Sequence, residues 1–324
     1  MTDDIVVRPR QREDDPRILE IYHQHETEFP LTLESLRFHL DERARPEGTD
    51  PRAAVAERDG MIVGDWYLQP NEWSADPNAY FASVEVDTCE YGKGVGSKLW
   101  EDLEREAIAL GARKVYAHIR ESEARSQRFA AARGFDKTGR AHRISRLMLS
   151  EVNLDGYDGI EENLARENIV VEPMSELDAD DEAFLRELHA AVEDAAQDIP
   201  STEDYKPTPF EIWRENFLKS PDSRAEAYFA ALHDGHPIGI ANLIIPGEGR
   251  AVNGLTAVMR ASRGRGVARV LKLRTVRWAQ ENGIEFIDTG NDAENARMLA
   301  INVRIGYKPL PAREEWLKEY PPGS

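Results

Sequence analysis

The sequence contains a single cysteine, Cys89, so no disulfide can form within one chain. Its 41 lysine and arginine residues are outnumbered by 60 aspartate and glutamate residues, which gives a formal net charge of −19 at pH 7. Because this charge repels phosphate backbones, nucleic acid is a poor candidate ligand. No apolar run approaches the roughly 20 residues that cross a membrane. These shortages favour a protein that acts in water, without nucleic acid or a membrane.

The sequence also lacks the patterns of a secretory signal, a metal site and a nucleophilic cysteine. Residues 1–4 lack the basic stretch and apolar core of a secretory signal, so we expect the cytoplasm. The eight histidines show no spacing typical of metal ligands, since His23 and His25, for example, fall on different faces of an expected helix. We therefore expect no metal ion. Cys89 has no histidine nearby in the sequence to activate it, so a nucleophilic cysteine is not expected.

An internal repeat spans most of the chain. Four segments recur in the same order: 5–9 as 169–173, 59–64 as 234–239, 92–96 as 264–268, and 133–135 as 305–307. The length of 324 residues also fits two domains. We place an N-terminal domain at 1–150 and a C-terminal domain at 169–324, joined by a partly helical linker at 151–168.

Each copy has the same expected order of elements. A short strand opens it, and helical segments follow, at 16–25 in the first copy and at 181–196 in the second. Two apolar strands then meet at Asp-Gly, which is a hairpin signal. A further strand leads into a glycine-rich turn, then into a helix that ends at Gly111 or Gly283, and then into another strand. This order predicts an α/β fold with a mixed sheet covered by helices.

The glycine-rich turn lies between a strand and a helix, so its backbone N–H groups and the helix dipole favour an anion. Its spacing matches neither the Walker loop nor the Gly-x-Gly-x-x-Gly pattern of dinucleotide sites. The second copy instead reads Arg263-Gly264-Arg265-Gly266-Val267-Ala268. This is similar to the Arg/Gln-x-x-Gly-x-Gly/Ala motif of the GNAT acetyltransferase superfamily. The chain therefore resembles a tandem GNAT protein, similar in layout to mycothiol synthase.

The resemblance implies two acyl-CoA N-acyltransferase folds with acetyl-CoA, or another short acyl-CoA, as the cofactor. The pyrophosphate of the cofactor would bind the turn, and its pantetheine arm would bind the strand that ends at Val258. In the second copy the resemblance assigns cofactor contacts to Val258, Arg263, Gly264, Arg265, Gly266, Val267, Ala268, Asn295 and Asn302. The corresponding contacts in the first copy are Val86, Gly92, Lys93, Gly94, Val95 and Gly96.

The first copy departs from the family motif at two positions. Tyr91 replaces the Arg or Gln, and Glu123 stands at the position of Asn295. A carboxylate beside a phosphate is repulsive, or neutral at best. We therefore expect the second copy to hold the working acetyl-CoA site, and the first to bind more weakly or to serve the structure alone.

Acetyl transfer to an amine needs a polarised carbonyl, a deprotonated amine and a protonated leaving thiolate. The resemblance assigns polarisation to the backbone N–H of Val258, with direct attack in a ternary complex. The tyrosine that the family uses as a proton donor is replaced by Asn302 and, in the first copy, by Ala130. The catalytic candidates that remain are Thr256, Asn291, Asp292 and Asn302.

Two other side chains are assigned to structure. Tyr307 occupies the Gly-aromatic position, which in this fold is usually core packing. Glu85 alternates with Val84 and Val86 along an expected strand, so we expect it on a solvated surface.

The favoured function is an acetyl-CoA-dependent N-acetyltransferase for a small primary amine. The alternative is a non-catalytic acyl-CoA-binding or regulatory protein, because the usual tyrosine is missing from both copies. Selection of the amine is assigned to residues 198–213, where Asp198, Asp204 and aromatic side chains suit a cation, although carboxylates are abundant throughout this chain. The fused copies supply internally the pairing that single-domain relatives obtain as dimers, so we expect a monomer.

Overall fold

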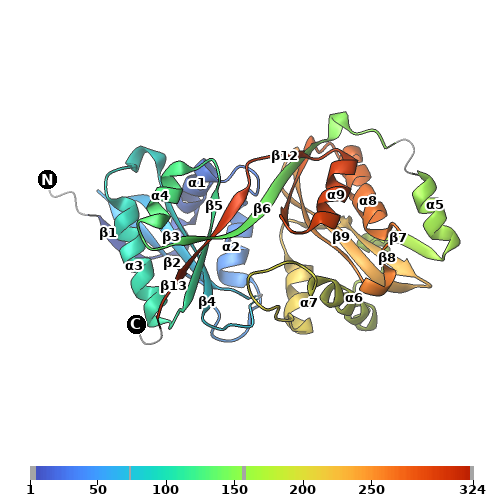
Figure 1. Ribbon diagram of the computed structural model, residues 1–324, viewed down its shortest axis with the longest axis horizontal. Helices are drawn as coiled ribbons and strands as arrows, with labels where there is room; N and C mark the ends of the chain where they lie inside the picture. Colours follow the sequence, from blue (N-terminus) through green and yellow to red (C-terminus); the bar gives the residue numbers. More distant parts are fainter. Residues whose placement is uncertain (1–4, 73, 155–157, 322–324) are drawn as a thin grey trace. The chain divides into compact units, whose positions relative to one another are not determined.

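The computed structural model describes residues 5–72, 74–154 and 158–321, and Figure 1 shows its ribbon. The chain forms two compact units. Unit 1 takes the described residues up to Ala141 together with Glu203–Lys206 and those from Arg313 onward, and unit 2 takes the rest. The boundaries expected near 150 and 168 divide the chain once. The units, in contrast, are not continuous in the chain, because Glu203–Lys206 and the residues from Arg313 onward belong to unit 1. Part of the expected linker, residues 155–157, lies outside the described residues.

Unit 1 is a mixed sheet with helices on both faces. Its strands lie in the order β1-β2-β3-β4-β5-β13-β6, where β4 and β5 pair in parallel. The strands are β1 (Val6–Pro9), β2 (Arg52–Arg58), β3 (Met61–Pro70), β4 (Ala79–Val86), β5 (Lys114–Arg120), β13 (Arg313–Glu319) and the first part of β6 (Asp136–Met148). The helices are α1 (Asp15–His25), α2 (Leu33–Arg37), α3 (Val95–Ala109) and α4 (Ala124–Ala131).

Alternation along β2 shows how the sheet of unit 1 divides its apolar side chains. Ala54 and Ala56 pack in the core that α3 covers, while Val55 points to the opposite face, with residues of α1 and α2. On α3, Leu99 and Leu103 are fully buried at helical spacing. The sheet is thus a middle layer between two helical layers.

Unit 2 has the same architecture. Its strands lie in the order β6-β11-β10-β9-β8-β7, with β12 beside β6 and with β10 and β11 parallel. They are the last part of β6, β7 (Ile169–Pro173), β8 (Ser223–His233), β9 (His236–Gly247), β10 (Arg250–Val258), β11 (Phe286–Asp292) and β12 (Lys308–Pro309). The helices are α5 (Asp158–Arg166), α6 (Glu182–Ala196), α7 (Phe210–Lys219), α8 (Val267–Glu281) and α9 (Ala296–Ile305).

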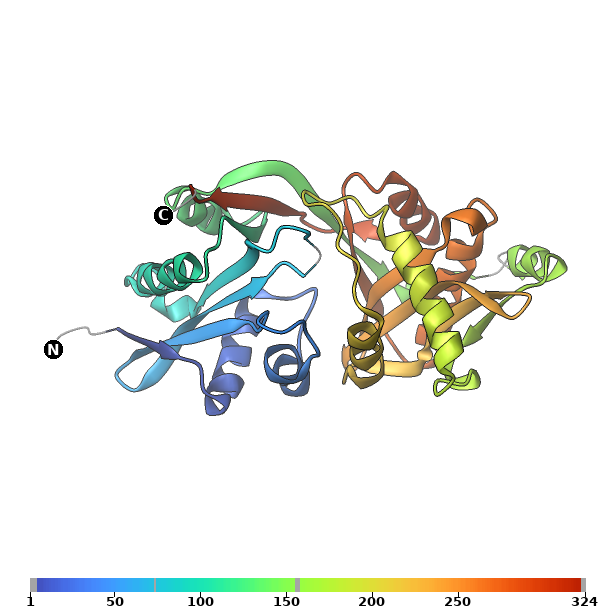
Figure 2. The ribbon, with the colours of Figure 1, turned by 90° about the horizontal axis from the view of Figure 1, so that it is seen from below.

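The helices of unit 2 cover both faces of its sheet. Figures 1 and 2 show α8 and α9 on one side, and α6 and α7 on the other. The core clusters agree, because Leu271 of α8 and Leu188 of α6 belong to different clusters on the two faces. No helix in the described ranges is both long enough and apolar enough to span a bilayer.

The local turns agree with the expected elements. Both hairpins turn at Asp-Gly pairs with positive φ at each residue, namely Asp59 (52°) with Gly60 (76°) and Asp234 (51°) with Gly235 (84°). Such turns match the twist of paired strands. Helices α3 and α8 are followed by Gly111 and Gly283, also at positive φ. The predicted mixed α/β sheet covered by helices is confirmed.

The last strand of each copy pairs with strands of the other copy. The last strand, β13, pairs with β5 of unit 1, with Trp316 opposite Ala117. The last part of β6 pairs with β11 of unit 2, with Ile144 opposite Gly290. Each sheet is therefore completed by a strand that the linear repeat does not assign to it.

Both units separate their parallel strand pair in the same way. Pairing of β4 with β5 ends at Phe81 and Tyr116, yet β4 stays paired with β3 as far as Val86. Pairing of β10 with β11 ends at Asn253, yet β10 stays paired with β9 as far as Val258. Each unit thus has an open strand edge just before its glycine turn, which is where backbone groups can accept an extended ligand.

Candidate active site

The glycine turn of unit 2 begins helix α8 and provides free backbone donors. Gly264 and Gly266 adopt φ values of 80° and 95°, a region that favours glycine. The first N–H groups of a helix have no partner within it, and the helix dipole makes this end positive. A Cβ atom added at Gly264 would meet no atom within 4 Å, whereas one at Gly266 would lie 3.4 Å from Ile160 Cγ2, so the turn is open to solvent at Gly264. This local structure suits an anionic ligand.

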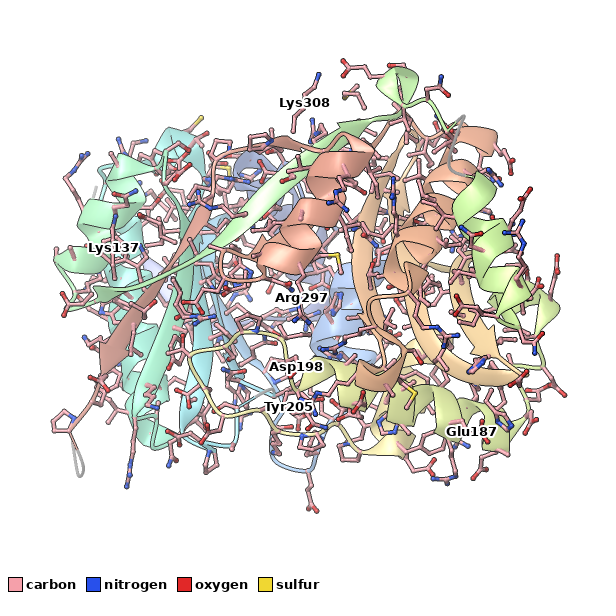
Figure 3. All side chains as sticks on the ribbon, turned by 45° about the vertical axis from the view of Figure 1, so that its right-hand side comes forward. Lys137, Glu187, Asp198, Tyr205, Arg297 and Lys308 are labelled. Atoms are coloured by element: carbon pink, nitrogen blue, oxygen red, sulfur yellow. The ribbon has the colours of Figure 1, made fainter. Side chains whose placement is uncertain are left out.

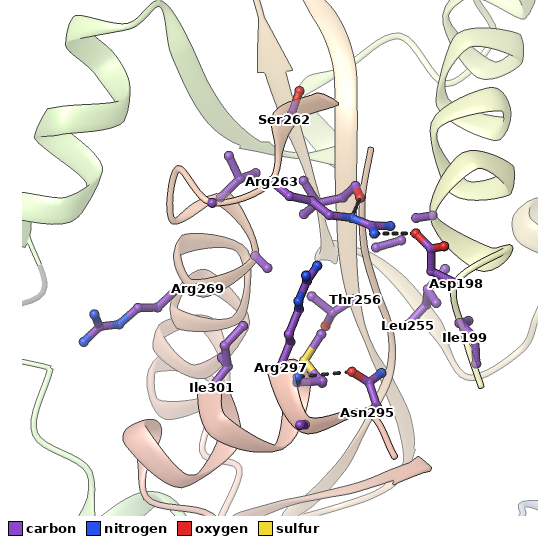
Figure 4. A pocket seen from close by; sticks show the side chains of 18 of the residues that line it. Asp198, Ile199, Leu255, Thr256, Ser262, Arg263, Arg269, Asn295, Arg297 and Ile301 are labelled. Atoms are coloured by element: carbon purple, nitrogen blue, oxygen red, sulfur yellow. Dashed lines mark hydrogen bonds and ion pairs between the residues drawn. The ribbon is translucent and has the colours of Figure 1, made fainter. Parts of the chain in front are cut away.

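A cavity of about 980 Å³ adjoins this turn. It is bounded by the open edge of β10, by the glycine turn, by the start of α9 and by the segment that follows α6 (Figure 4). Its lining includes these predicted cofactor residues: Val258, Arg263, Gly264, Gly266, Val267, Ala268 and Asn295. Arg265 and Asn302 are not part of the lining. The repeat and the fold thus bring most of the predicted set to one cavity.

A buried polar network supports the bulge at which β10 leaves β11. The register of β10 on β9 shifts between Asn253 and Thr256. The Asn253 side chain donates to the Asn242 carbonyl at 2.9 Å, and the Asn242 side chain accepts from the Leu255 N–H at 2.7 Å. Lys272 of α8 donates to the Asn253 side chain, and burial lowers the pKa of Lys272 to about 7. The network satisfies backbone groups that the bulge removes from the ladder.

Arg263 is held at the rim of the cavity by two acceptors. Its Nε donates to the Val258 carbonyl at 2.9 Å, and its Nη1 lies 2.5 Å from Asp198 Oδ2. Asp198 also pairs with Arg260 at 2.6 Å, and the two guanidinium groups hold its pKa well below the usual range. Asp198 was predicted to contact the amine substrate. In the structure it is the counter-ion of these two arginines.

Arg297 is a cavity residue that was not singled out in the sequence. It lies in the first turn of α9 and extends into the cavity (Figures 3 and 4). The lining contains four arginines, Arg263, Arg269, Arg297 and Arg304, but only two carboxylates, Asp198 and Glu294. The signal was available, because Arg125 stands at the matching position of the first copy. A cationic lining in so acidic a chain favours an anionic ligand.

Of the predicted catalytic residues, the structure places Thr256 in the cavity. Its Oγ1 is enclosed and has no hydrogen-bond partner in the part of the chain that is described. Asn302 instead donates to the Asn291 side chain at 2.7 Å, and neither residue lines the cavity. Asp292 accepts from the backbone N–H of Glu294 at 2.8 Å. Thr256 is therefore the one candidate among these four that faces the cavity.

Three other predicted residues have structural contacts. Asn295 caps α9 by accepting from the Met298 N–H at 3.2 Å, and it also lines the cavity. Arg265 pairs with Glu167 at 2.5 Å. Tyr307 is 5% exposed and belongs to a core cluster, as expected for its position.

Unit 1 has the same turn with different side chains. Gly92 and Gly94 adopt φ values of 77° and 86°. His25 makes a hydrogen bond of 2.9 Å with the Val86 carbonyl, and the Tyr91 hydroxyl lies 3.3 Å from the other ring nitrogen of His25. The carbonyl that Arg263 binds in unit 2 is thus bound by a histidine in unit 1.

The prediction that Glu85 lies on a solvated surface is wrong. Its side chain is half-buried, because α1 packs against the face of β4 that carries it. Burial and the nearby charge of Glu26 raise its pKa from 4.5 to about 7. Alternation placed Glu85 correctly opposite its valine neighbours, but it did not reveal that both faces of this strand are covered.

The segment expected to select the amine is divided between the two units. Asp198 and Pro200 line the cavity of unit 2. Asp204 and Tyr205 belong to unit 1, where Tyr205 bridges Ser74 and the Asp204 carbonyl accepts from the Ala75 N–H at 3.0 Å. These contacts join residues far apart in the chain, so local sequence patterns could not reveal them.

A family model described as the acetyltransferase (GNAT) family matches residues 18–135 and 187–307, one match in each copy. The chain belongs to the GNAT acetyltransferase family. It is a GNAT-type N-acetyltransferase with two tandem GNAT folds. The predicted family and fold are therefore confirmed by these matches. Proteins of this fold bind acyl-CoA.

Known proteins resemble this chain in part or throughout. Phosphinothricin N-acetyltransferase of Streptomyces coelicolor is 30% identical over 156 residues, which cover 45% of this chain and 90% of that protein. A tandem GNAT protein from the clavulanic acid biosynthesis pathway has a TM-score of 0.74 at 18% identity, covering 99% of this chain and all of that one. A GCN5-related N-acetyltransferase from Sphaerobacter thermophilus has a TM-score of 0.68 at 18% identity, covering 100% and 98%. These two structures show the fold.

Proposed function

We propose that unit 2 transfers an acetyl group from acetyl-CoA to a small primary amine by direct attack in a ternary complex. The observation that carries this proposal is the cavity beside the glycine turn. It combines free backbone donors, four arginines and an open strand edge in one place. Acetyl-CoA has matching parts, namely anionic phosphates and an extended arm with amide groups.

The residues present fit this cofactor. Main-chain N–H groups from Gly264 to Ala268 and the guanidinium groups of Arg263 and Arg297 would hold its phosphates. The open edge of β10 would hydrogen-bond its amides. The enclosed and unpartnered Oγ1 of Thr256 supports a polar ligand at this edge, since a buried hydroxyl without a partner is costly.

When bound, the cofactor supplies an activated acyl thioester. The backbone N–H of Val258 would polarise its carbonyl, a role that does not depend on the side chain. Thr256 would hydrogen-bond the reactants through Oγ1, with water completing proton transfer. Attack of the amine on the acyl carbon would form the C–N bond and break the C–S bond, and one proton would pass from the amine to the departing sulfur.

Calorimetric titration of the whole chain with acetyl-CoA tests the proposed site. Gly266→Glu places a side chain and a negative charge in the turn, at a φ of 95°. Gly94→Glu is the matched control, because it introduces the same residue at a φ of 86° in unit 1. We expect one site per chain that Gly266→Glu abolishes and Gly94→Glu preserves.

The opposite pattern, or no binding at millimolar ligand, would overturn the assignment to unit 2. Melting curves of both variants show whether each still folds. Release of free thiol with a panel of small primary amines then tests turnover. Binding without release for any amine would contradict the proposed acceptor class.

A further inference from the structure

Strand β10 of unit 2 has a bulge, whereas β4 of unit 1 pairs regularly with its neighbour β3. The register of β10 on β9 shifts after Asn253, so that two residues, Gly254 and Leu255, lie opposite a single residue of β9. In unit 1, β3 and β4 keep an unbroken register along all of Gly64–Pro70. A bulge of one extra residue turns the side chains that follow it to a new direction. The two units therefore differ just before their glycine turns.

The bulge directly precedes the part of β10 that lines the cavity. The lining includes every residue of Leu255–Val258. With regular pairing after Asn253, Thr256 would lie opposite Ile240, whose side chain packs on the face of the sheet that α6 covers. Thr256 would then point to that face, because a shift of one residue turns each side chain to the other side of the sheet. The bulge thus sets the direction of the residues that would meet the acyl group.

Three polar side chains support the bulge. The Asn253 side chain donates to the Asn242 carbonyl at 2.9 Å, and the Asn242 side chain accepts from the Leu255 N–H at 2.7 Å. A Cβ atom added at Gly254 would lie 2.8 Å from Asn242 Nδ2, so only glycine leaves room for this asparagine. Lys272 of α8 donates to Asn253 Oδ1 and so completes the set.

Lys272 is a costly residue for its place in the core. It is 1% exposed, and no carboxylate of the described residues lies within ion-pair distance of its Nζ. A buried lysine without such a partner is unfavourable. The matching position in unit 1, also the sixth residue of its helix, is Trp100, which packs against Phe135 in the core. Packing at this position therefore does not require a lysine.

The asparagine that Lys272 contacts is also replaced in unit 1. Gly64 and Gly239 occupy matching places, because a Cβ atom on either would lie 2.6 Å from a carbonyl oxygen of the next strand. The leucine four residues after each glycine faces Asn253 in unit 2 and Ala82 in unit 1. The polar pair thus occurs with the bulge, and the apolar pair occurs with regular pairing.

We propose that Lys272 is a positioning residue for acyl transfer in unit 2. Through Asn253 it holds the bulge of β10, and the bulge in turn directs Thr256 and the backbone of Val258 toward the cavity. Lys272 does not line the cavity, so it acts through β10. An ammonium group and a neutral amine both donate N–H groups, so the contact does not depend on its charge. The inference rests on the proposed function, since positioning has a purpose only if unit 2 transfers an acyl group.

Hydrogen exchange of the ligand-free chain tests the hold of Lys272 on the bulge. The variants are K272M, N253A and K272M/N253A. We expect exchange at residues 252–258 to be about 10-fold faster in each, because buried polar atoms without partners favour local opening. Since Lys272 acts through Asn253, the double variant should lose no more protection than N253A alone. T275V is the control, because it removes a buried hydroxyl of the same helix that donates to the carbonyl of residue 272.

Acyl transfer provides the second measurement, with acetyl-CoA and the small primary amine that gives the fastest release of thiol. K272M should lower kcat at least ~10-fold, because small displacements of positioned groups are costly to the rate. The dissociation constant for acetyl-CoA should rise by no more than about threefold, since the glycine turn that holds the phosphates is not part of the network. A lysine with a purely structural role would lower the melting temperature and leave kcat per folded molecule unchanged.

Unchanged exchange at residues 252–258 in K272M, or an unchanged kcat, overturns the inference and leaves the proposed function standing. Additive effects of K272M and N253A overturn it as well, because they show that the two residues act separately. Should K272M fail to fold, N253A decides, since it breaks the same contact from the other side. If the original chain binds no acetyl-CoA, the proposed function fails, and the inference fails with it.

Discussion

The two units have the same fold and opposite chemistry. Each has a parallel strand pair that separates, an open strand edge and a glycine turn with two residues at positive φ. In unit 2 the cavity beside this frame is lined by four arginines. In unit 1 two carboxylates, Asp65 and Glu85, lie opposite each other on β3 and β4, and a tyrosine replaces the arginine of the turn. The shared backbone thus determines where a ligand can bind, while a few side chains determine which charge that ligand can carry.

We expect the largest effect from placing a glutamate at the same position of the glycine turn in each unit, which reverses a charge at Arg263 and adds one at Tyr91. Arg263→Glu should raise the apparent KM for acetyl-CoA by roughly 100-fold or more, because it loses charge-assisted hydrogen bonds and adds repulsion to phosphate. Tyr91→Glu should change it by no more than about twofold. Steady-state kinetics with an amine found in the panel provide the measurement. Equal effects of the two substitutions would end the distinction between the units.

A second effect concerns stability against pH, and it has opposite signs in the two units. Glu85 has a pKa of about 7 in the folded protein and 4.5 otherwise, so its contribution is fully present below pH 4.5 and is lost as the pH rises to 7. Lys272 has a pKa of about 7 when folded and 10.5 otherwise, so stability rises between pH 7 and pH 10.5. These pKa differences correspond to changes in the free energy of unfolding of about 3 kcal/mol for Glu85 and about 5 kcal/mol for Lys272.

Denaturant unfolding from pH 5 to pH 10 measures both slopes. E85Q should remove the fall in the free energy of unfolding at acidic pH. Lys272→Met should remove the rise in the free energy of unfolding at alkaline pH. If either slope persists in the variant designed to remove it, other titratable groups cause that slope. Tyr307, whose ring lies 5.2 Å from Lys272 Nζ, acts in the opposite direction, because burial and the charge of Asp288 raise its pKa and so lower stability at alkaline pH.

The smallest effect concerns the position of the missing tyrosine. Unit 1 has Ala130 there, and unit 2 has Asn302, whose amide donates to Asn291. Asn302→Leu should lower the free energy of unfolding by about 1 kcal/mol, since it leaves the half-buried Asn291 oxygen without its donor. Since Asn302 does not line the cavity, kcat should stay within about threefold. A much larger loss of kcat would place Asn302 in contact with the reactants.

Much of the site could be predicted from local patterns. The positive φ at Gly264 and Gly266 follows from the residue type that such turns require, and Val258 follows from the strand that precedes them. Arg297 has no local feature that distinguishes it from a solvated arginine, and its signal in the sequence is Arg125 at the matching position of the other copy. The pairing of Asn302 with Asn291 was missed because it depends on how a helix packs against a strand.

The repeat, the hairpins, the helix ends, the glycine turn and the family could all be predicted from the printed sequence, because each depends on residues close together in the chain. Which strand completes each sheet, and which side chains are buried opposite one another, follows from the folded structure. It placed β13 in unit 1, and it brought Asp65 opposite the half-buried Glu85. Burial and cross-strand register arise from contacts between distant segments, and these contacts determine the charge and the pKa of a site.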